Sequence, residues 1–402
     1  MNPFPIVRAM ARRNWLTSLL FLFLITVSVA LGVAITAQER ALREGSARAS
    51  DPFDLIVAAP GSPTEVLFNV VYLRPSDVEV IQPEQLAPIL EDPQAGFAAP
   101  VAFGDSAEGF PVVGTIAELL THIAGGQEIE GRLWTHPEEA VIGAKVPFGP
   151  GDRMMTAHGT HFVEGEHGYV TVVGKLPPTG TAWDTGVFVP VEYSWSTHGI
   201  VSGHAPETYD ENGNPPLGPP FDAEYLGPVP AVVLDAGSLA AAYGLRQKYR
   251  TSETTAFFPA EVLTEIYGYL GDVRAIMSAL TVATQVLVVA AILSGIVALV
   301  QLYRTRLAVL RAMGATRGYV FAVMWSYIMA LILGGTVLGL AGGYAVAQFI
   351  SRVFSAETGL TLAARIGGAE LTLAAALIGL GALLAVVPAI ALFRKPAVTY
   401  LR

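Results

Sequence analysis

The chain has 402 residues, of which 52% are hydrophobic and only 14% are charged. Soluble domains carry about 25% charged residues, so this composition argues against an ordinary soluble enzyme and favours a membrane protein. The chain contains no cysteine, which excludes disulfide scaffolds, zinc sites built on cysteine and thiol catalysis.

Four apolar stretches are long enough to cross a bilayer as helices. Each has at least about 20 residues, and at about 1.5 Å per residue that covers a hydrocarbon core of about 30 Å. None contains Asp, Glu, Lys, Arg or His. The predicted fold is an α-helical membrane protein with four transmembrane helices, at residues 15–35, 276–303, 320–349 and 371–393. A large mixed α/β extracytoplasmic domain, residues 36–275, is inserted between helices 1 and 2.

The distribution of charge predicts the orientation. The amino end (1–14), the loop at 304–318 and the tail (394–402) together hold ten basic residues and no acid. The large region 36–275 has a net charge of −20, and the short loop 350–370 balances two basic residues against two acids. Because cytoplasmic segments are enriched in Lys and Arg, we expect both termini and the 304–318 loop to be cytoplasmic. The acidic domain and the 350–370 loop then lie outside.

A cleaved signal peptide is the alternative interpretation of the first apolar stretch. Basic residues precede the stretch, and Ile35-Thr36-Ala37 could imitate a cleavage site. The apolar run is longer than the roughly 7–15 residues of a signal core. Removing it would also place the start of the large domain on the wrong side, so we expect a retained helix.

The region between the first two spans has mixed α/β signals. Short β-branched runs bounded by Gly, Pro or Asp predict strands at 53–59, 139–146, 169–176, 187–191 and 231–234. Helices are expected at 115–123 and 236–249, and from Pro259 onward into the second span. Residues 205–230 contain seven prolines and three glycines, which predicts an irregular surface loop.

Glycines recur every fourth residue in the third span, at Gly335, Gly339 and Gly343. This spacing allows another helix to approach closely in lipid. The helix that packs against these glycines could belong to the same chain or to a second copy, and the spacing fits both equally well.

The spans contain no ionisable side chain at membrane depth, where ion- or proton-driven transporters bind their coupling ion. No GxxxxGK[ST] phosphate loop is present either, and no Ser-His-Asp or HExxH pattern organises the outer acids. The chain is therefore not expected to be an enzyme, and its energy must come from another polypeptide. The net charge of −20 on the outer region also argues against nucleic-acid binding.

Three motifs resemble one known family. Residues 304–317 read RTRLAVLRAMGATR, close to a cytoplasmic segment written RxEIAILRALGATR. Residues 387–402 and 169–180 are similar, more weakly, to the tail of that family and to its outer strand and turn. Together with the layout of one span, a large domain and three spans, the chain resembles the FtsX-like permease family, the MacB and lipoprotein-releasing type of ABC transporter subunit.

The resemblance implies a permease subunit in a bacterial inner membrane, with both ends in the cytoplasm. It implies pairing with a second permease copy, either identical or a sister subunit, and with a separate ABC ATPase that binds ATP and Mg. ATPase motion would be relayed mechanically to the outer domain, which would handle a periplasmic partner or substrate-binding protein. The alternative is an FtsX-like transducer whose outer domain activates a periplasmic cell-wall hydrolase.

The resemblance also assigns candidate residues for coupling to the ATPase. Leu307, Leu310 and Met313 recur on one face of a short helix, and Gly314 suits its end. One departure is Arg306, which stands where the family often has Glu, so a salt bridge from that Glu does not carry over. The candidates are Arg304, Arg306, Leu307, Leu310, Arg311, Met313, Gly314 and Arg317.

A histidine cluster in the outer domain predicts a metal site. All seven histidines fall in this region, and three lie within ten residues, beside two acids. Imidazole and carboxylate suit zinc, and without cysteine this is the ligand set available. The alternative is a polar loop whose histidines are exposed to solvent and bind no metal. The candidate zinc ligands are His158, His161, Glu164, Glu166 and His167.

Overall fold

The computed structural model describes residues 2–158, 168–268 and 309–394, together with isolated positions between 282 and 303. These residues form two compact units, which we call the helical unit and the α/β unit. The helical unit is Met1–Arg43, Leu270–Val353 and Leu362–Arg402, and the α/β unit is Glu44–Tyr269 and Phe354–Thr361. Each unit is described separately below.

Long helices dominate the helical unit. A short helix, α1 (Phe4–Arg13), precedes α2 (Trp15–Ser50), and the later helices are α9 (Arg317–Thr358) and α10 (Gly368–Arg394). Among the described residues, α2 and residues 317–356 of α9 are long and apolar enough to cross a membrane, and α10 contains a shorter apolar stretch, 370–386. The predicted second span, 276–303, is described only at isolated positions, so the four-span layout stays a prediction.

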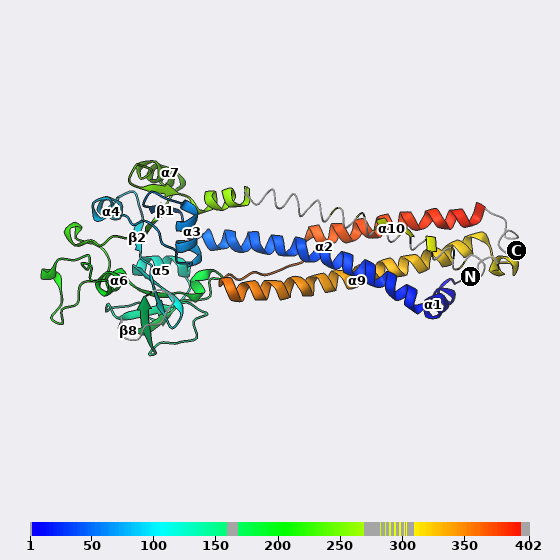
Figure 1. Ribbon diagram of the computed structural model, residues 1–402, viewed down its shortest axis with the longest axis horizontal. Coiled ribbons are helices and arrows are strands. Elements are labelled where there is room, and N and C mark those ends of the chain that lie inside the picture. Colours follow the sequence, from blue (N-terminus) through cyan, green and yellow to red (C-terminus); the bar gives the residue numbers. More distant parts are fainter. Residues whose placement is uncertain are drawn as a thin grey trace. The chain divides into compact units, whose positions relative to one another are not determined.

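Helices α2 and α9 pack closely, and Figure 1 shows them side by side with α10. A Cβ placed on Gly335, Gly339 or Gly343 would come within 2.7 Å of side-chain carbons of Ile25, Val29 or Val33. The glycine stripe predicted in the third span therefore faces a helix of the same chain. Buried Val29, Val33, Val323 and Ile328 continue this apolar core.

The helices extend past the apolar stretches that predicted them. Helix α2 continues from the expected boundary at Ile35 to Ser50, and α9 continues from Phe349 to Thr358. The residues that follow Ile35 include Ala, Gln, Glu, Arg and Leu, all good helix formers, and no proline occurs before Pro52. The limits of the apolar runs mark where polarity changes, which is not where the helices end.

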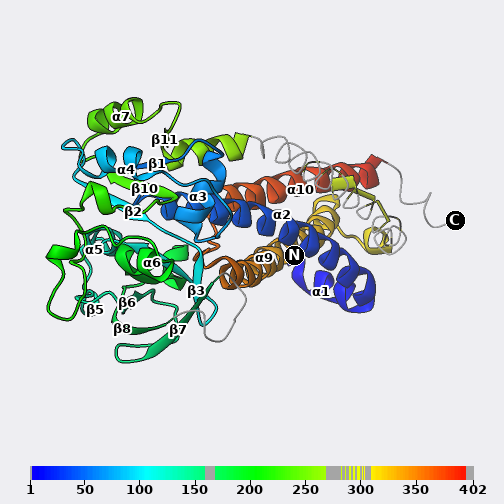
Figure 2. The ribbon, with the colours of Figure 1, turned by 60° about the vertical axis from the view of Figure 1, so that its left-hand side comes forward.

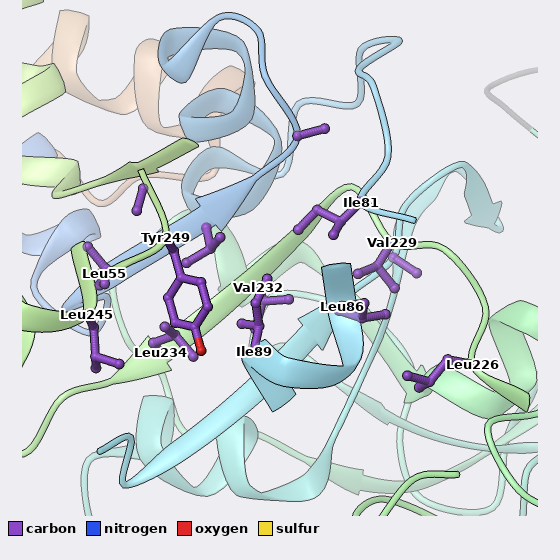
Figure 3. Packing of buried hydrophobic residues seen from close by; sticks show 14 of the residues in the cluster. Leu55, Ile81, Leu86, Ile89, Leu226, Val229, Val232, Leu234, Leu245 and Tyr249 are labelled. Carbon is purple, nitrogen blue, oxygen red and sulfur yellow. The ribbon is translucent and has the colours of Figure 1, made fainter. Parts of the chain in front are cut away.

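The first sheet of the α/β unit has four antiparallel strands in the order β11-β1-β10-β2. Its strands are β1 (Leu55–Ala58), β2 (Phe97–Val101), β10 (Ala231–Asp235) and β11 (Thr255–Phe257). Helices α4 (Pro83–Leu90) and α7 (Leu239–Lys248) supply side chains to its core, as Figure 3 shows. Tyr249 anchors α7, because its hydroxyl lies 2.5 Å from the carboxylate of Asp92 and 2.8 Å from the carbonyl of Pro88, and both of these oxygens can accept its one proton.

The second sheet has seven strands in the order β5-β8-β6-β9-β4-β3-β7. Because β7 pairs with β8 as well as with β3, six of these strands close into a ring around a buried apolar core. Figure 2 shows these strands beside α5 (Ala117–Ala124) and α6 (Val191–Thr197). The strands are β3 (Asp105–Ala107), β4 (Phe110–Thr115), β5 (Glu130–Gly131), β6 (Glu139–Ile142), β7 (Arg153–His158), β8 (Tyr169–Lys175) and β9 (Val187–Pro190).

The mixed α/β prediction for this region is confirmed at each expected strand. Both internal helices are also present, and residues 259–268 are helical as expected. Residues 205–230 form an irregular loop with two short 3₁₀ turns, Pro206–Thr208 and Ala223–Tyr225. Strands β2, β3, β4, β5, β7 and β11, and helices α1, α3 (Pro63–Tyr72), α4 and α6, had no sequence prediction.

Candidate coupling sites

The predicted cytoplasmic coupling segment contains a tight helix–turn–helix junction. Residues 309–312 are helical, and Gly314, with φ of +98°, ends the helix in a conformation that favours glycine. The amide of Gly314 donates to the carbonyl of Arg311, and the amide of Ala315 donates to the carbonyl of Leu310. Thr316 then caps α9, because its hydroxyl accepts from the amide of Tyr319 at 3.3 Å. The Gly-Ala-Thr sequence thus ends one helix and starts the next within three residues.

The structure divides the predicted coupling residues between the interior and the surface. Leu310 is partly buried and packs against the apolar core of the helical unit, whereas Met313 is 72% exposed. Leu310 therefore contributes to internal packing, and Met313 is the residue of this pair that a partner could reach. Gly314 and Arg317 are exposed and Arg311 is half-buried, while Arg304, Arg306 and Leu307 lie outside the described residues. Val309, 44% exposed, joins Met313 on the surface.

Tyrosines that flank the coupling segment hold helix α1 in place. The hydroxyl of Tyr303 donates to the carbonyl of Met10 at 3.0 Å and accepts from Asn14 Nδ2 at 2.8 Å. The hydroxyl of Tyr319 donates to the carbonyl of Asn2 at 3.2 Å. Val7 and Met10 of α1 are buried in the same apolar core as Tyr303. Helix α1 is therefore packed beside the coupling segment.

A second candidate site, in the α/β unit, is the loop Thr179–Asp184. The buried carboxylate of Asp184 accepts from the amide and hydroxyl of Thr179, both at 2.7 Å, and from the amide of Gly180 at 3.0 Å. The neighbouring Trp183 is fully buried, and its indole N–H donates to the carbonyl of Val70 at 3.0 Å. These contacts give the loop a fixed shape on a buried base.

This loop holds the segment Gly359–Thr361, which follows α9 in the chain. The amide of Thr361 donates to the carbonyl of Gly180 at 3.0 Å. Lys145 Nζ donates to the carbonyl of Gly359 at 2.6 Å and to Thr361 Oγ1 at 3.3 Å, and lies 3.6 Å from Asp184 Oδ2. We call the contacts of Lys145, Gly180 and Asp184 with Gly359–Thr361 the outer joint.

The rest of the loop between α9 and α10 is bound within the helical unit. Arg40 of α2 donates to the carbonyl of Arg365 at 3.0 Å and forms an ion pair with the buried Glu370. Gln348 of α9 donates to the carbonyl of Ala364 at 2.9 Å. One loop therefore has its first residues fixed in the α/β unit and its later residues fixed in the helical unit.

An open hollow of about 770 Å³ lies beside the outer joint. Its walls carry both charges, from Glu128 and Glu130 on one hand and Lys175 on the other. The ammonium of Lys175 already donates to the carbonyls of Val146 and Phe148. Leu176, Pro177 and Pro178 add apolar side chains to the same walls, so the hollow has a mixed surface.

The candidate zinc ligands are not tested by the structure. Residues 159–167 lie outside the described part of the chain, and His158 is described only as the end of β7. Across the described residues, no group of three or more His, Asp or Glu side chains is placed to hold a metal ion. His204 instead lies 3.4 Å from the buried Glu192, and His198 lies 3.4 Å from Asp105.

The outer joint was not predicted from the sequence. Its residues lie far apart in the chain, and only the tertiary fold brings Lys145, Asp184 and Thr361 together. One sequence signal did point near it, because the segment 169–180 that resembles the family's outer strand and turn forms β8 and leads into this loop.

The comparison with known families decides the nature of the C-terminal region. Residues 278–397 match the family model described as FtsX-like permease C-terminal. This region belongs to the FtsX-like permease family. The predicted family is confirmed, and the match covers the coupling turn, α9 and α10. No curated protein matches the chain.

The match to this family points to a membrane protein. FtsX-like permeases are membrane subunits that typically lack ATPase motifs and generally work with ABC ATPases. The apolar helices α2 and α9 agree with a membrane location.

Proposed function

We propose that this chain is the permease subunit of an ATP-driven ABC transporter that transmits ATPase motion to its outer α/β unit. A separate ATPase binds at the coupling turn around Met313 in the cytoplasm of a bacterial cell. A second permease copy completes the transporter in the inner membrane. The outer unit acts on a periplasmic substrate or partner protein.

The outer joint is the observation that carries this proposal. Helix α9 begins at Arg317, beside the coupling turn, and runs to Thr358. Gly359–Thr361 follows directly and is held by Lys145 and by the loop Thr179–Asp184. A continuous helix thus connects the turn that is expected to bind the ATPase with a segment fixed to the outer unit. A displacement of α9 along its axis would pull on this loop.

The contacts of the joint suit the transmission of force. The carbonyls of Gly359 and Thr361 accept hydrogen bonds from two different cations, Lys145 at 2.6 Å and Arg48 at 3.4 Å. Charge-assisted hydrogen bonds are stronger than neutral ones. Gly359, with φ of +74°, also packs against Ala182 and Thr185, where a Cβ would come within 3.3 Å of both. The segment is therefore held by both polar contacts and close packing.

A disulfide across the joint tests the proposal directly. A Cβ on Gly180 would lie 3.5 Å from the Cβ of Thr361, within the Cβ–Cβ range of about 3.5–4.5 Å for disulfides. The chain contains no cysteine, so Gly180→Cys with Thr361→Cys introduces one unambiguous pair. Because Gly180 has φ of +73°, Gly180→Ala with Thr361→Ser controls for backbone strain.

The readout is hydrogen–deuterium exchange of the α/β unit in the complex with its ATPase, with and without ATP. We expect Lys145→Gln to remove the ATP-dependent change in exchange while ATP hydrolysis continues. The oxidised cysteine pair should restore that change in the Lys145→Gln background, and reduction should remove it again. A disulfide that stops ATP hydrolysis, or that fails to restore the change, would contradict transmission through a closed joint.

The alternative transducer of a cell-wall hydrolase would need the same relay, so the experiment tests what both functions share. A zinc role for His158, His161, Glu164, Glu166 and His167 is a finer proposal. It is tested by calorimetric titration of the chain with zinc, with the three histidines replaced by alanine as the comparison. Equal heats in the two proteins would exclude this loop as the ligand set.

A further inference from the structure

Helix α1 has two distinct faces. Val7 and Met10 are buried against the helical unit, and Ile6 and Ala11 pack beside them. The opposite face is exposed and carries all three arginines of the amino end, Arg8, Arg12 and Arg13, together with Phe4, Pro5 and Ala9. With 3.6 residues per turn, Phe4, Arg8 and Arg12 form one stripe along this face.

The contacts of α1 fix which face looks outward. Tyr303 binds the carbonyl of Met10, and Tyr319 binds the carbonyl of Asn2, so both ends of the helix are held to the same body. Asn14, which separates α1 from α2, is itself held by Tyr303 at 2.8 Å. The arginine face is therefore a fixed surface of the helical unit.

The position of α1 in the chain sets its depth relative to the bilayer. Trp15 is the first residue of α2, and Trp15, Leu16, Leu19 and Leu20 are 55–64% exposed, as expected for side chains that face lipid. Trp is enriched at the level of the lipid headgroups. Arg12 precedes Trp15 by less than one helical turn. The arginine face is thus next to the headgroup layer.

We propose that the exposed face of α1 binds the headgroups of anionic phospholipids in the cytoplasmic leaflet. Guanidinium groups make paired hydrogen bonds to phosphate, and their long stems can lie along apolar surface while the charge reaches the headgroups. Phe4, 68% exposed, supplies an apolar side chain beside the arginines. Helices with this combination of basic and aromatic residues lie in the membrane interface.

An acidic surface on the ATPase is the other class of partner that a basic helix face could meet. Two observations favour lipid. Large apolar side chains, Phe4 and Trp15, flank the arginines and are exposed, which suits a bilayer better than a polar protein surface. No acidic residue occurs before Glu39, so the field of this segment is uniformly positive. The proposal requires only the membrane location and is independent of the joint described above.

Quenching of Trp15 fluorescence by brominated lipid tests the proposal in the full chain. Nanodiscs of phosphatidylcholine receive a small fixed fraction of either brominated phosphatidylglycerol or brominated phosphatidylcholine. Trp325→Phe removes the tryptophan of α9, and Trp15→Phe in that background gives the baseline. The ratio of the two quenching efficiencies reports whether the anionic lipid is enriched near α1.

We expect enrichment of phosphatidylglycerol in the parent protein. Arg8→Gln with Arg12→Gln should reduce it by about fivefold for each charge removed, the change that corresponds to ~1 kcal/mol for each basic residue near an anionic surface. Arg8→Lys with Arg12→Lys should retain most of it. The matched control is Arg153→Gln with Arg250→Gln, two exposed arginines of the α/β unit.

Two results would overturn the proposal. One is equal quenching by the two brominated lipids in the parent protein. The other is unchanged enrichment in the Arg8/Arg12 glutamine variant combined with loss of ATPase co-purification, which would assign the face to the ATPase. Because lipid enrichment and ATPase binding are measured separately, neither result depends on whether the outer joint transmits motion.

Discussion

Gly339 of α9 lies directly against Val29 of α2, so that a Cβ on Gly339 would be 2.5 Å from the Cβ of Val29. Val29 is fully buried and cannot yield without disturbing its neighbours. Gly379 of α10 is a contrasting helical glycine, because a Cβ there would meet no atom within 4 Å. Comparing substitutions at the two positions distinguishes the effect of close helix packing from the effect of replacing any glycine in a helix.

Gly339→Ala should destabilise the helical unit by about 1–3 kcal/mol, the usual cost of overpacking. Gly379→Ala should be neutral or stabilising by up to ~1 kcal/mol, because alanine is the better helix former. Thermal unfolding of the full chain in detergent measures both. Equal effects at the two positions would mean that α2 and α9 are not in close contact.

The contacts of Glu139 indicate that the stability of the α/β unit decreases in acid. Its carboxylate pairs with Arg132 and also accepts from the amides of Thr135 at 2.7 Å and His136 at 3.2 Å. The Arg132 hydrogen bond, with these amides, outweighs burial and lowers the pKa of Glu139 from 4.5 to about 2. Because the folded-state pKa is lowered, the stabilisation is present above about pH 4.5 and is lost as the pH falls toward 2.

Glu139→Gln should therefore lower the free energy of unfolding at pH 7 by about 1–2 kcal/mol, discounted because Arg132 is 49% exposed. The same variant should lose less stability than the parent between pH 5 and pH 2. Tryptophan fluorescence during urea unfolding at each pH gives the values. Glu211→Gln, at an exposed position of the proline-rich loop, is the control and should leave the pH profile unchanged.

The sequence predicted those elements whose residue type and periodicity agree with their surroundings. Strands β1, β8, β9 and β10 are β-branched runs, and their sheets bury them as expected. Strand β2 was missed because Phe97–Val101 contains two alanines and a proline, and its pairing with β10 decides its conformation. Local propensity is overridden there by tertiary contacts.

The two candidate sites also differ in how far the sequence alone could predict their contacts. The coupling turn is local, so Gly314 and Thr316 could be assigned to a helix end and a helix start from neighbouring residues alone. The partial burial of Leu310 could not be predicted in this way, because it depends on contacts with helices that are distant in the chain. The outer joint depends on contacts across more than 200 residues, between Lys145 and Gly359. No spacing rule predicts such a contact.

Membrane orientation gives a prediction that covers the whole layout. A reporter fused after Arg402 should be cytoplasmic, whereas one inserted at Asn212-Gly213, an exposed turn of the proline-rich loop, should be outside. The charge distribution requires this result, because basic segments stay in the cytoplasm. Paired alkaline phosphatase and green fluorescent protein fusions distinguish the compartments. Signals from the same side at both positions would contradict the three spans predicted after the outer region, because an odd number of spans places these positions on opposite sides.

Met313 offers the sharpest test of ATPase binding. Its side chain is 72% exposed at the tip of the coupling turn, and an apolar side chain at that position suits a groove on a partner. Met313→Asp would place an unpaired charge in that contact, at a cost of a few kcal/mol, and should abolish co-purification of the ATPase. Met313→Leu should retain it.

The fold of the permease should be unaffected by Met313→Asp, because surface substitutions usually change stability by less than about 0.5 kcal/mol. Leu310→Asp differs, since Leu310 is partly buried and packs against the core of the helical unit, and it should lower thermal stability as well as ATPase binding. Leu239→Asp, at a position 76% exposed in the α/β unit, controls for added surface charge and should leave co-purification intact. If Met313→Asp retained the ATPase with normal hydrolysis, the turn would serve only to connect its two helices.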